Sequence, residues 1–258
     1  MDVYWLEQSG ADLPEQNDWL SASETARLSA MRFEKRRADW RLGRWTAKRA
    51  LAACLDLSAD FRSLAEMEIR PASSGAPEVF LAGQRADVTI SLSHSAGIAI
   101  CAVAVSGAEL GCDLEVVEPR SDTFVADYFT VEEQELIRLV NPADQSRLVT
   151  LLWSSKESAL KALGEGLRLD TRCVGVDLAP RPPGTDEHWD DPALTLQPSS
   201  GSPGWRPLQV RFGDVQVFQG WWQPAHDLVR TMVATPAPSR PIPLLEEGLC
   251  HLALTSLR

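Results

Sequence analysis

The sequence lacks several features that would have assigned it to a class at once. It has no run of about 18 or more apolar residues, so a membrane-spanning helix is not predicted. Residues 1–5 show no basic stretch followed by an apolar one, so we expect no secretory signal and a cytoplasmic protein. It has neither a P-loop nor a G-x-G-x-x-G sequence, so neither of these nucleotide-binding motifs is indicated.

Cysteine pairs and excess positive charge are also missing. The five cysteines show no C-x-x-C spacing, which argues against a zinc site and predicts reduced, mostly buried thiols. The net charge of −11 argues against general nucleic-acid binding. Charge is uneven, however, because residues 31–49 contain eight Lys or Arg and only two acidic residues, Glu34 and Asp39. This segment is therefore expected to bind an anion.

The order of predicted elements indicates an α+β protein. The 258 residues fit one large domain or two small ones, and a hydrophobic fraction of 44% suffices for a core. Helices and antiparallel strands alternate in two rough halves with a seam near residues 106–112. The predicted helices begin at Ser21, with a capping box to Glu24, and at Thr130, and cover residues 32–55 and 147–163. The predicted strands cover residues 2–8, 88–92, 98–105, 110–116, 208–212, 215–222 and 228–234.

The remaining segments read as turns and loops. Residues 71–77 and 224–225 predict turns, and Ala96-Gly97 predicts a tight hairpin link. Residues 180–207 are rich in Pro, Gly, Ser and Asp and predict a long inserted loop. The tail is proline-rich from Pro236 to Pro243, and the last residues of the chain are compatible with a short helix.

One stripe of the basic helix is a candidate phosphate-binding surface. Arg37, Arg41, Arg44 and Lys48 are spaced four, three and four residues apart, so they share a helix side. The guanidinium fork matches phosphate geometry, which favours a phosphorylated nucleotide as a partner. A solvated helix face is the alternative interpretation.

Two carboxylates on one predicted strand suggest a metal site. Asp113 and Glu115 are two residues apart and therefore point to the same face, where carboxylate oxygens can share Mg²⁺. Glu157 would supply a third oxygen or act as a base, and Lys161, one helical turn on, would neutralise a phosphate. The alternatives are a solvated strand edge and an i,i+4 ion pair on a surface helix.

The Ser93-His94 pair has two interpretations as well. Both side chains can donate to phosphate oxygens at a strand end, whereas a lone histidine is commonly a structural one. A Ser-His-Asp hydrolase is disfavoured, because neighbours on a strand point to opposite faces and no G-x-S-x-G turn is present.

The chain resembles the 4′-phosphopantetheinyl transferase superfamily, Sfp type. The resemblance spans about residues 30–175 and rests on three stretches in order: Leu92–Ser95, Gly111–Glu115 and Trp153–Gly164. The last stretch is long and specific. The Arg41-Leu42-Gly43-Arg44 stretch followed by Lys48 also looks like the N-terminal helix of the family.

The resemblance implies an α+β (α/β) fold of two similar halves related by a pseudo-twofold axis. We accordingly expect an N-terminal half (residues 1–108), a C-terminal half (109–235) and a tail (236–258). The family implies that Asp113, Glu115 and Glu157 hold Mg²⁺ and that Glu157, Lys161 and His94 are catalytic. It further implies that coenzyme A is contacted by Arg37, Arg41, Arg44, Ser93, His94 and Lys161.

The implied reaction moves the 4′-phosphopantetheine arm of coenzyme A to a serine of an apo acyl or peptidyl carrier protein and releases 3′,5′-ADP. The partners are thus coenzyme A and a carrier protein that docks on a neutral or basic surface, and the expected state is a monomer without nucleic acid or membrane. Two alternatives stay open: a non-catalytic protein that binds coenzyme A or the carrier, and a metal-dependent phosphodiesterase.

The sequence departs from the family pattern at two motif positions, and the insertion at 180–207 and the tail after Ala234 are longer than expected for the family core. Gly75-Ala76-Pro77 stands where many members have Gly-Lys-Pro, so the contact of that lysine with coenzyme A is missing or comes from elsewhere. Cys112 replaces the more usual isoleucine or valine at a position expected to be packed.

Overall fold

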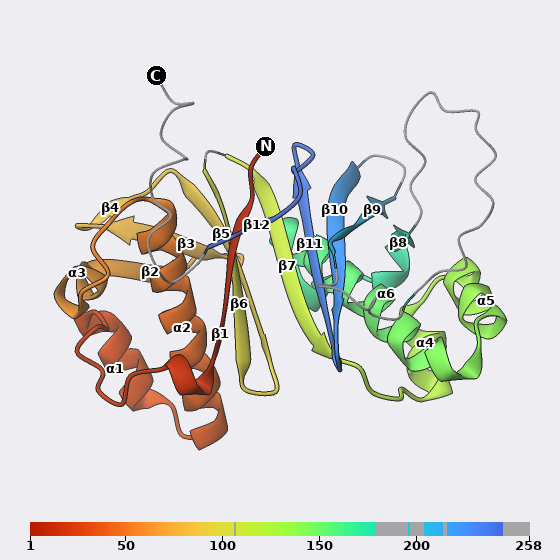
Figure 1. The fold of residues 1–258 in the computed structure, drawn as a ribbon, viewed down its shortest axis with the longest axis horizontal. Helices are drawn as coiled ribbons and strands as arrows, with labels where there is room; N and C mark the ends of the chain where they lie inside the picture. The colour runs from red at the N-terminus through yellow and green to blue at the C-terminus, as the bar shows by residue number, and fades with distance from the viewer. Residues whose placement is uncertain (106, 179–195, 197–203, 214–215, 245–258) are drawn as a thin grey trace. The chain divides into compact units, whose positions relative to one another are not determined.

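The chain forms two compact units, Met1–Leu110 with Ser239–Arg258, and Gly111–Pro238. The computed structural model describes residues 1–105, 107–178, 196, 204–213 and 216–244. Most of the predicted loop at 180–207 and the possible helix at the end of the chain lie outside these residues. The mixed helices and sheets confirm the predicted α+β class, while the predicted axis between the halves stays a prediction (Figure 1).

The first unit is a long helix on a sheet that is antiparallel except for one short parallel edge strand, Ile242–Pro243. Its sheet has the strand order β12-β1-β6-β5, and α2 packs against β1, β5 and β6 (Figure 1). A second sheet has the order β2-β3-β4. The elements of this unit are β1 (Tyr4–Ser9), α1 (Ala22–Ala30), α2 (Glu34–Cys54), α3 (Phe61–Glu66), β2 (Met67–Pro71), β3 (Pro77–Leu81), β4 (Gln84–Arg85), β5 (Val88–Ser95), β6 (Ile98–Val105) and β12 (Ile242–Pro243).

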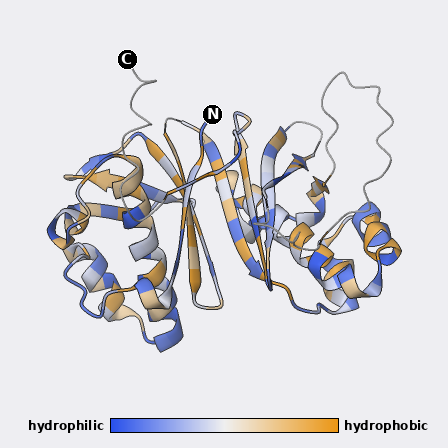
Figure 2. Ribbon diagram, viewed as in Figure 1, coloured by the Kyte–Doolittle hydropathy of each residue, from blue (hydrophilic) through white to orange (hydrophobic). Residues whose placement is uncertain are grey.

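Sequence pattern explains the core of this unit. The apolar strand β6 is buried between β1 and β5, and the buried side of α2 includes Ala47 and Leu51, which lie four residues apart on one helix face. The first turn of α2 is hydrophilic, whereas β6 lies on the hydrophobic side of the scale (Figure 2). The β5–β6 hairpin turns at Ala96 and Gly97, both with positive φ, which confirms the predicted tight link.

The second unit repeats this plan. Its sheet has the order β7-β11-β10-β9-β8, and α6 packs against β8, β9, β10 and β11 (Figure 1). The elements are β7 (Glu109–Val116), α4 (Asp122–Tyr128), α5 (Val131–Leu139), α6 (Pro142–Ala162), β8 (Val174–Asp177), β9 (Arg206–Phe212), β10 (Gln216–Ala225) and β11 (Leu228–Thr235). Three-residue 3₁₀ turns at Gly10–Asp12, Gly166–Arg168 and Thr171–Cys173 complete the described elements of both units.

Each unit contains its own buried ion pair, and the two pairs are built in the same way. In both, a capping-box glutamate of a short helix pairs with a fully buried lysine of the following 21-residue helix. Glu24 pairs with Lys48 at 2.6 Å, and Glu133 pairs with Lys156 at 2.8 Å. Each lysine also donates to two carbonyl oxygens, so each buried charge is compensated.

Several predicted bounds were wrong for local reasons. The helix expected from residue 147 begins at Pro142, because Asn141 caps it and proline suits a first turn. The strand expected to end at residue 92 continues to Ser95, so the Ser-His-Ser stretch is itself strand. The turn expected at residues 224–225 lies instead after Ala225, at His226, which has positive φ.

Cysteine burial largely follows expectation. Cys101 and Cys112 are buried, Cys54 is half-buried and Cys173 is exposed, and all four are free thiols. Within the residues that the structure describes, no helix is both long and apolar enough to cross a membrane.

Candidate functional site: a carboxylate cluster and a basic pocket

A cluster of three carboxylates lies in the second unit. Asp113 and Glu115 come from β7 and share one strand face, as their spacing predicts, and Glu157 comes from α6. One oxygen of each lies within 4.8 Å of the other two. Asp113 is buried, and the other two are half-buried. The structure therefore brings together the three residues that the sequence predicts as metal ligands.

Gly111 explains how the strand and the helix come so close. A Cβ atom at this position would lie 1.7 Å from the Ser158 carbonyl oxygen and 2.9 Å from the Ala162 backbone nitrogen, both on α6. Only glycine permits this approach, because a backbone neighbour cannot rotate away. The glycine that opens the Gly111–Glu115 stretch thus sets the distance between β7 and Glu157.

Two cations lie beside the carboxylate cluster. Lys161 Nζ donates to Asp113 Oδ1 at 2.7 Å and to the Cys112 carbonyl at 3.1 Å. The alternative of a surface ion pair between Glu157 and Lys161 is therefore wrong, since Lys161 turns toward the strand. Arg120 Nη2 lies 3.8 Å from Glu115 Oε2.

Trp153 supports the cluster from α6. Its indole donates a hydrogen bond to Glu115. Its ring packs edge-on against Phe124 and Tyr128, with centroids 5.1 and 5.2 Å away. The side chain is 8% exposed, so the packing fixes the direction of this hydrogen bond.

Burial and the mutual repulsion of the carboxylates raise the pKa of two residues of the cluster. Burial, and then the charge of Asp113, raise the pKa of Glu157 to about 7. The same two causes raise the pKa of Glu115. Burial acts to lower the pKa of Lys161, but the charge of Asp113 outweighs it, so that pKa is raised and the ammonium is retained. A bound cation would relieve the repulsion among the carboxylates.

This pKa predicts how the stability of the metal-free protein depends on pH. The folded-state pKa of Glu157 lies above its ordinary value of 4.5, so the folded protein holds this proton more tightly than the unfolded chain. The stabilising contribution is complete below pH 4.5 and is lost as the pH rises through about 7. In EDTA, the melting temperature of the wild type should therefore fall relative to Glu157→Gln between about pH 5 and about pH 8. Parallel curves for the two proteins would contradict the shift.

The donor set fits a hard divalent cation. All three side chains offer carboxylate oxygens, the ligands that Mg²⁺ prefers. When all three carboxylates are ionised, three negative charges face the two positive charges of Lys161 and Arg120, so the cluster then has a negative excess. The residues present therefore suit Mg²⁺.

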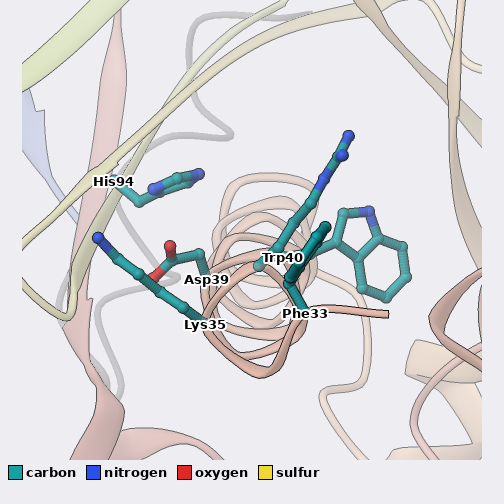
Figure 3. A pocket seen from close by; sticks show the side chains of 6 residues that line it. Phe33, Lys35, Asp39, Trp40 and His94 are labelled. Atoms are coloured by element: carbon teal, nitrogen blue, oxygen red, sulfur yellow. The ribbon is translucent and has the colours of Figure 1, made fainter. Parts of the chain in front are cut away.

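A basic pocket lies in the first unit. It has a volume of about 510 Å³ and is lined by Phe33, Lys35, Arg36, Asp39, Trp40 and His94. The Lys35 and His94 side chains project to the same side, next to Asp39, while Phe33 and Trp40 stand on the other side of the α2 axis (Figure 3). His94 comes from β5, where it pairs with Ala99 of β6. The pocket thus combines cationic and aromatic groups, as an anionic nucleotide requires.

Ser93 and His94 face opposite ways. Ser93 is buried, whereas His94 is exposed, which is the alternation expected for neighbours on a strand. His94 therefore belongs to the pocket, and Ser93 points into the fold. This arrangement removes the geometric basis for a serine hydrolase in which these two residues act together.

The three predicted arginines of α2 do not line this pocket. Arg41 Nη2 donates to the carbonyl oxygens of Pro14, at 2.7 Å, and Glu15, at 3.2 Å. Arg44 stacks over Trp40, and burial lowers its pKa to about 10 despite the charge of Glu24. Arg37 is exposed. Their role in binding coenzyme A stays a prediction, and the pocket residues Lys35 and Arg36 are added here as candidates.

Sequence reasoning missed four residues of these sites. Lys35 and Arg36 lie in the basic segment but outside the stripe that begins at Arg37, so helical spacing does not select them. Trp153 opens a motif that was recognised, yet its hydrogen bond to Glu115 joins residues far apart in the chain. No local pattern points to Arg120, since only the turn between β7 and α4 brings it back to Glu115.

Comparisons with known proteins agree with the geometry. Residues 109–200 match the model of the ACPS family, described as the 4′-phosphopantetheinyl transferase superfamily. The chain is 27% identical over 164 residues to the 4′-phosphopantetheinyl transferase HetI of Nostoc sp. (strain PCC 7120), which covers 63% of this chain and 67% of HetI. It is 31% identical over 92 residues to a 4′-phosphopantetheinyl transferase of Bacillus subtilis, which covers 36% of this chain and 40% of that protein.

These matches overlap the structural site. The region that matches the family contains Asp113, Glu115, Glu157 and Lys161, and so includes the whole carboxylate cluster. Both named relatives are transferases, which confirms the predicted enzyme class. The resemblance seen in the sequence stretches is thereby confirmed: residues 109–200 of this chain are similar to the 4′-phosphopantetheinyl transferase superfamily.

Proposed function

We propose that this protein transfers the 4′-phosphopantetheine arm of coenzyme A to a serine of an apo acyl or peptidyl carrier protein. The observation that carries the proposal is the convergence of Asp113, Glu115 and Glu157 from two elements, with Lys161 bonded to Asp113. A protein that merely binds coenzyme A has no need of three carboxylates beside an anionic ligand, since they would repel it.

The reaction exchanges a phosphoanhydride bond of coenzyme A for a phosphoester bond to serine. The serine oxygen of the carrier forms a bond to the phosphorus next to the pantetheine arm. The bond from that phosphorus to the bridging oxygen breaks, and 3′,5′-ADP leaves with the electron pair. The serine proton must be removed, because a hydroxyl group is a weak nucleophile.

The residues of the cluster divide this work. Asp113 and Glu115 would hold Mg²⁺, which offsets the charge of the pyrophosphate and orients its two phosphates. Glu157 supplies a third oxygen or accepts the serine proton, a form of general base catalysis that typically contributes about 10²–10⁴-fold. Lys161 keeps its proton and donates to a phosphate oxygen beside Asp113.

The basic pocket of the first unit suits the 3′-phosphate of coenzyme A. Lys35 and Arg36 are consecutive residues at the exposed start of α2, and His94 adds a third side chain with a nitrogen donor. Charge-assisted hydrogen bonds from such groups to phosphate are among the stronger ones in proteins. We infer that this pocket binds the far phosphate of the substrate.

One assay tests the function and separates it from its rivals. The protein is incubated with coenzyme A, Mg²⁺ and an apo carrier protein, and the carrier is weighed by intact mass spectrometry. Transfer adds the mass of one phosphopantetheine to the carrier. Release of ADP without a mass gain would indicate the phosphodiesterase, and neither product would indicate a non-catalytic binder. EDTA should abolish the mass gain.

The pocket assignment has its own test. Replacing both Lys35 and Arg36 by alanine should raise the KM for coenzyme A by about tenfold or more and change kcat much less, since it removes binding of a group remote from the reaction. Dephospho-coenzyme A lacks the 3′-phosphate. The ratio of its KM to the KM for coenzyme A should therefore be much smaller for the double variant than for the wild type. Arg62→Ala, an exposed charge of the same unit, is the control. An unchanged preference would place the 3′-phosphate elsewhere.

A further inference from the structure

Arg120 stands apart from the other cations near the two sites. It lies between β7 and α4, just before Ser121, the residue that caps α4. Its guanidinium lies 3.8 Å from Glu115 and 3.1 Å from Glu118. A charge-assisted hydrogen bond spans about 2.7–2.9 Å, so Glu115 attracts Arg120 without binding it closely.

The surroundings hold Arg120 in place through stacking and through one of its nitrogens, Nη2. Its guanidinium stacks over Phe124, with 5.2 Å from Cζ to the ring centroid. Phe124 packs on Trp153, which donates to Glu115. The remaining anchor, Glu118, has a side chain that is 53% exposed, so its pull is weakened by water. Among the described residues, the ion pairs of Arg120 with carboxylates involve Nη2 alone, which leaves most of its fork for another acceptor.

Lys161 does not share this freedom. Its ammonium is bonded to Asp113 and to the Cys112 carbonyl, inside the cluster. The side chain of Arg120 is about as exposed as that of Lys161, but it lies 3.8 Å from the nearest oxygen of the cluster. The cluster is therefore bordered by one cation that is bonded to it and one that is not, and the second has the planar geometry that matches phosphate.

We propose that Arg120 is a further substrate-binding residue, one that donates to the pyrophosphate of coenzyme A beside the carboxylate cluster. The inference rests on the transferase function proposed above. Its charge acts in opposite directions on two ligands: it repels a divalent cation held by the carboxylates and attracts an anionic substrate. Removing the charge therefore has to strengthen the first interaction and weaken the second.

Two binding measurements on the Arg120→Gln variant test this pair of opposite effects. Titration with Mg²⁺ alone, followed by calorimetry, should show affinity raised by about three- to tenfold, the scale expected for a unit charge near a partly exposed divalent site. Titration with coenzyme A in saturating Mg²⁺ should show affinity lowered by about tenfold. Arg120→Lys should restore the Mg²⁺ affinity of the wild type and recover only part of the coenzyme A affinity, because lysine keeps the charge and lacks the fork.

Arg168→Gln is the matched control, since Arg168 is an exposed arginine of the same unit paired with Glu165. The affinities of Arg168→Gln for Mg²⁺ and for coenzyme A should equal those of the wild type. Equal constants in Arg120→Gln and the wild type, or a loss of both affinities together, would overturn the inference. So would a variant whose sole defect is a higher KM for the carrier protein, because Arg120 would then contact the carrier. If the wild type binds both ligands but modifies no carrier, the transferase function fails while the binding test of Arg120 still stands.

Discussion

Replacing Asp113 by asparagine should lower the rate of carrier modification by about a thousandfold or more while the protein stays folded. Asp113 is buried, lies in the carboxylate cluster and accepts a hydrogen bond from Lys161. The amide has the same shape but no charge, so the cluster loses the carboxylate around which it is built. The loss of charge stabilisation at a metal site amounts to several kcal/mol, which corresponds to at least this factor in rate.

The prediction extends to Glu157, the carboxylate that α6 contributes to the cluster. Alanine at position 113 or 157 should abolish transfer as well, and Glu157→Gln should do so without creating a cavity. Far-ultraviolet circular dichroism and thermal melting establish that each variant is folded, and calorimetry with Mg²⁺ alone measures the loss of cation binding. Asp127→Asn, which alters an exposed acid of α4, is the control for a change of net charge. Full activity in either variant of the cluster would rule out the metal assignment.

Replacing Gly111 by alanine should have the largest effect on stability among single methyl additions in the second unit. The new Cβ would overlap the backbone of α6 at Ser158, where no side chain can move aside. Overpacking of this kind typically costs about 1–3 kcal/mol and occasionally more, and a clash with backbone belongs at the upper end. We expect a loss of about 3 kcal/mol in the free energy of unfolding, measured by urea denaturation.

The same substitution should also weaken the site. If α6 moves away from β7 to accommodate the methyl group, Glu157 moves away from Asp113 and Glu115, and Mg²⁺ affinity should fall together with stability. Gly175→Ala is the control, because Gly175 also lies on a strand of this unit and a Cβ there meets nothing within 4 Å. A Gly111→Ala protein as stable as the wild type would show that the helix and strand are not held at this distance.

The carboxylates could be predicted from the sequence because their geometry is local. Asp113 and Glu115 are two residues apart on a strand, so their side chains lie on the same face. This relation holds whatever the strand packs against. The capping boxes at Ser21 and Thr130 could also be predicted, since each involves residues three positions apart. The hairpin of β5 and β6 followed from alternation and a two-residue link.

The roles of the cations could not be predicted in the same way. In sequence, the basic segment of α2 looks like one charged stripe. In the structure, Lys48 is buried against Glu24, Arg41 binds two carbonyl oxygens, and Lys35 lines the pocket. Helical periodicity gives the side of a helix on which a residue lies, but it does not say whether that side meets solvent or another element.

The sequence by itself determined the class of fold, the carboxylates of the site and the family that their order indicates, because these depend on spacing along one strand or one helix. Tertiary structure alone decided which partner each charge has. Lys161 binds Asp113 across 48 positions of the chain, and Arg120 lies beside Glu115 because the chain turns after β7. The contact of Lys161 with Asp113 arises from the close approach of β7 and α6 at Gly111, a distance that packing sets and that no local pattern encodes.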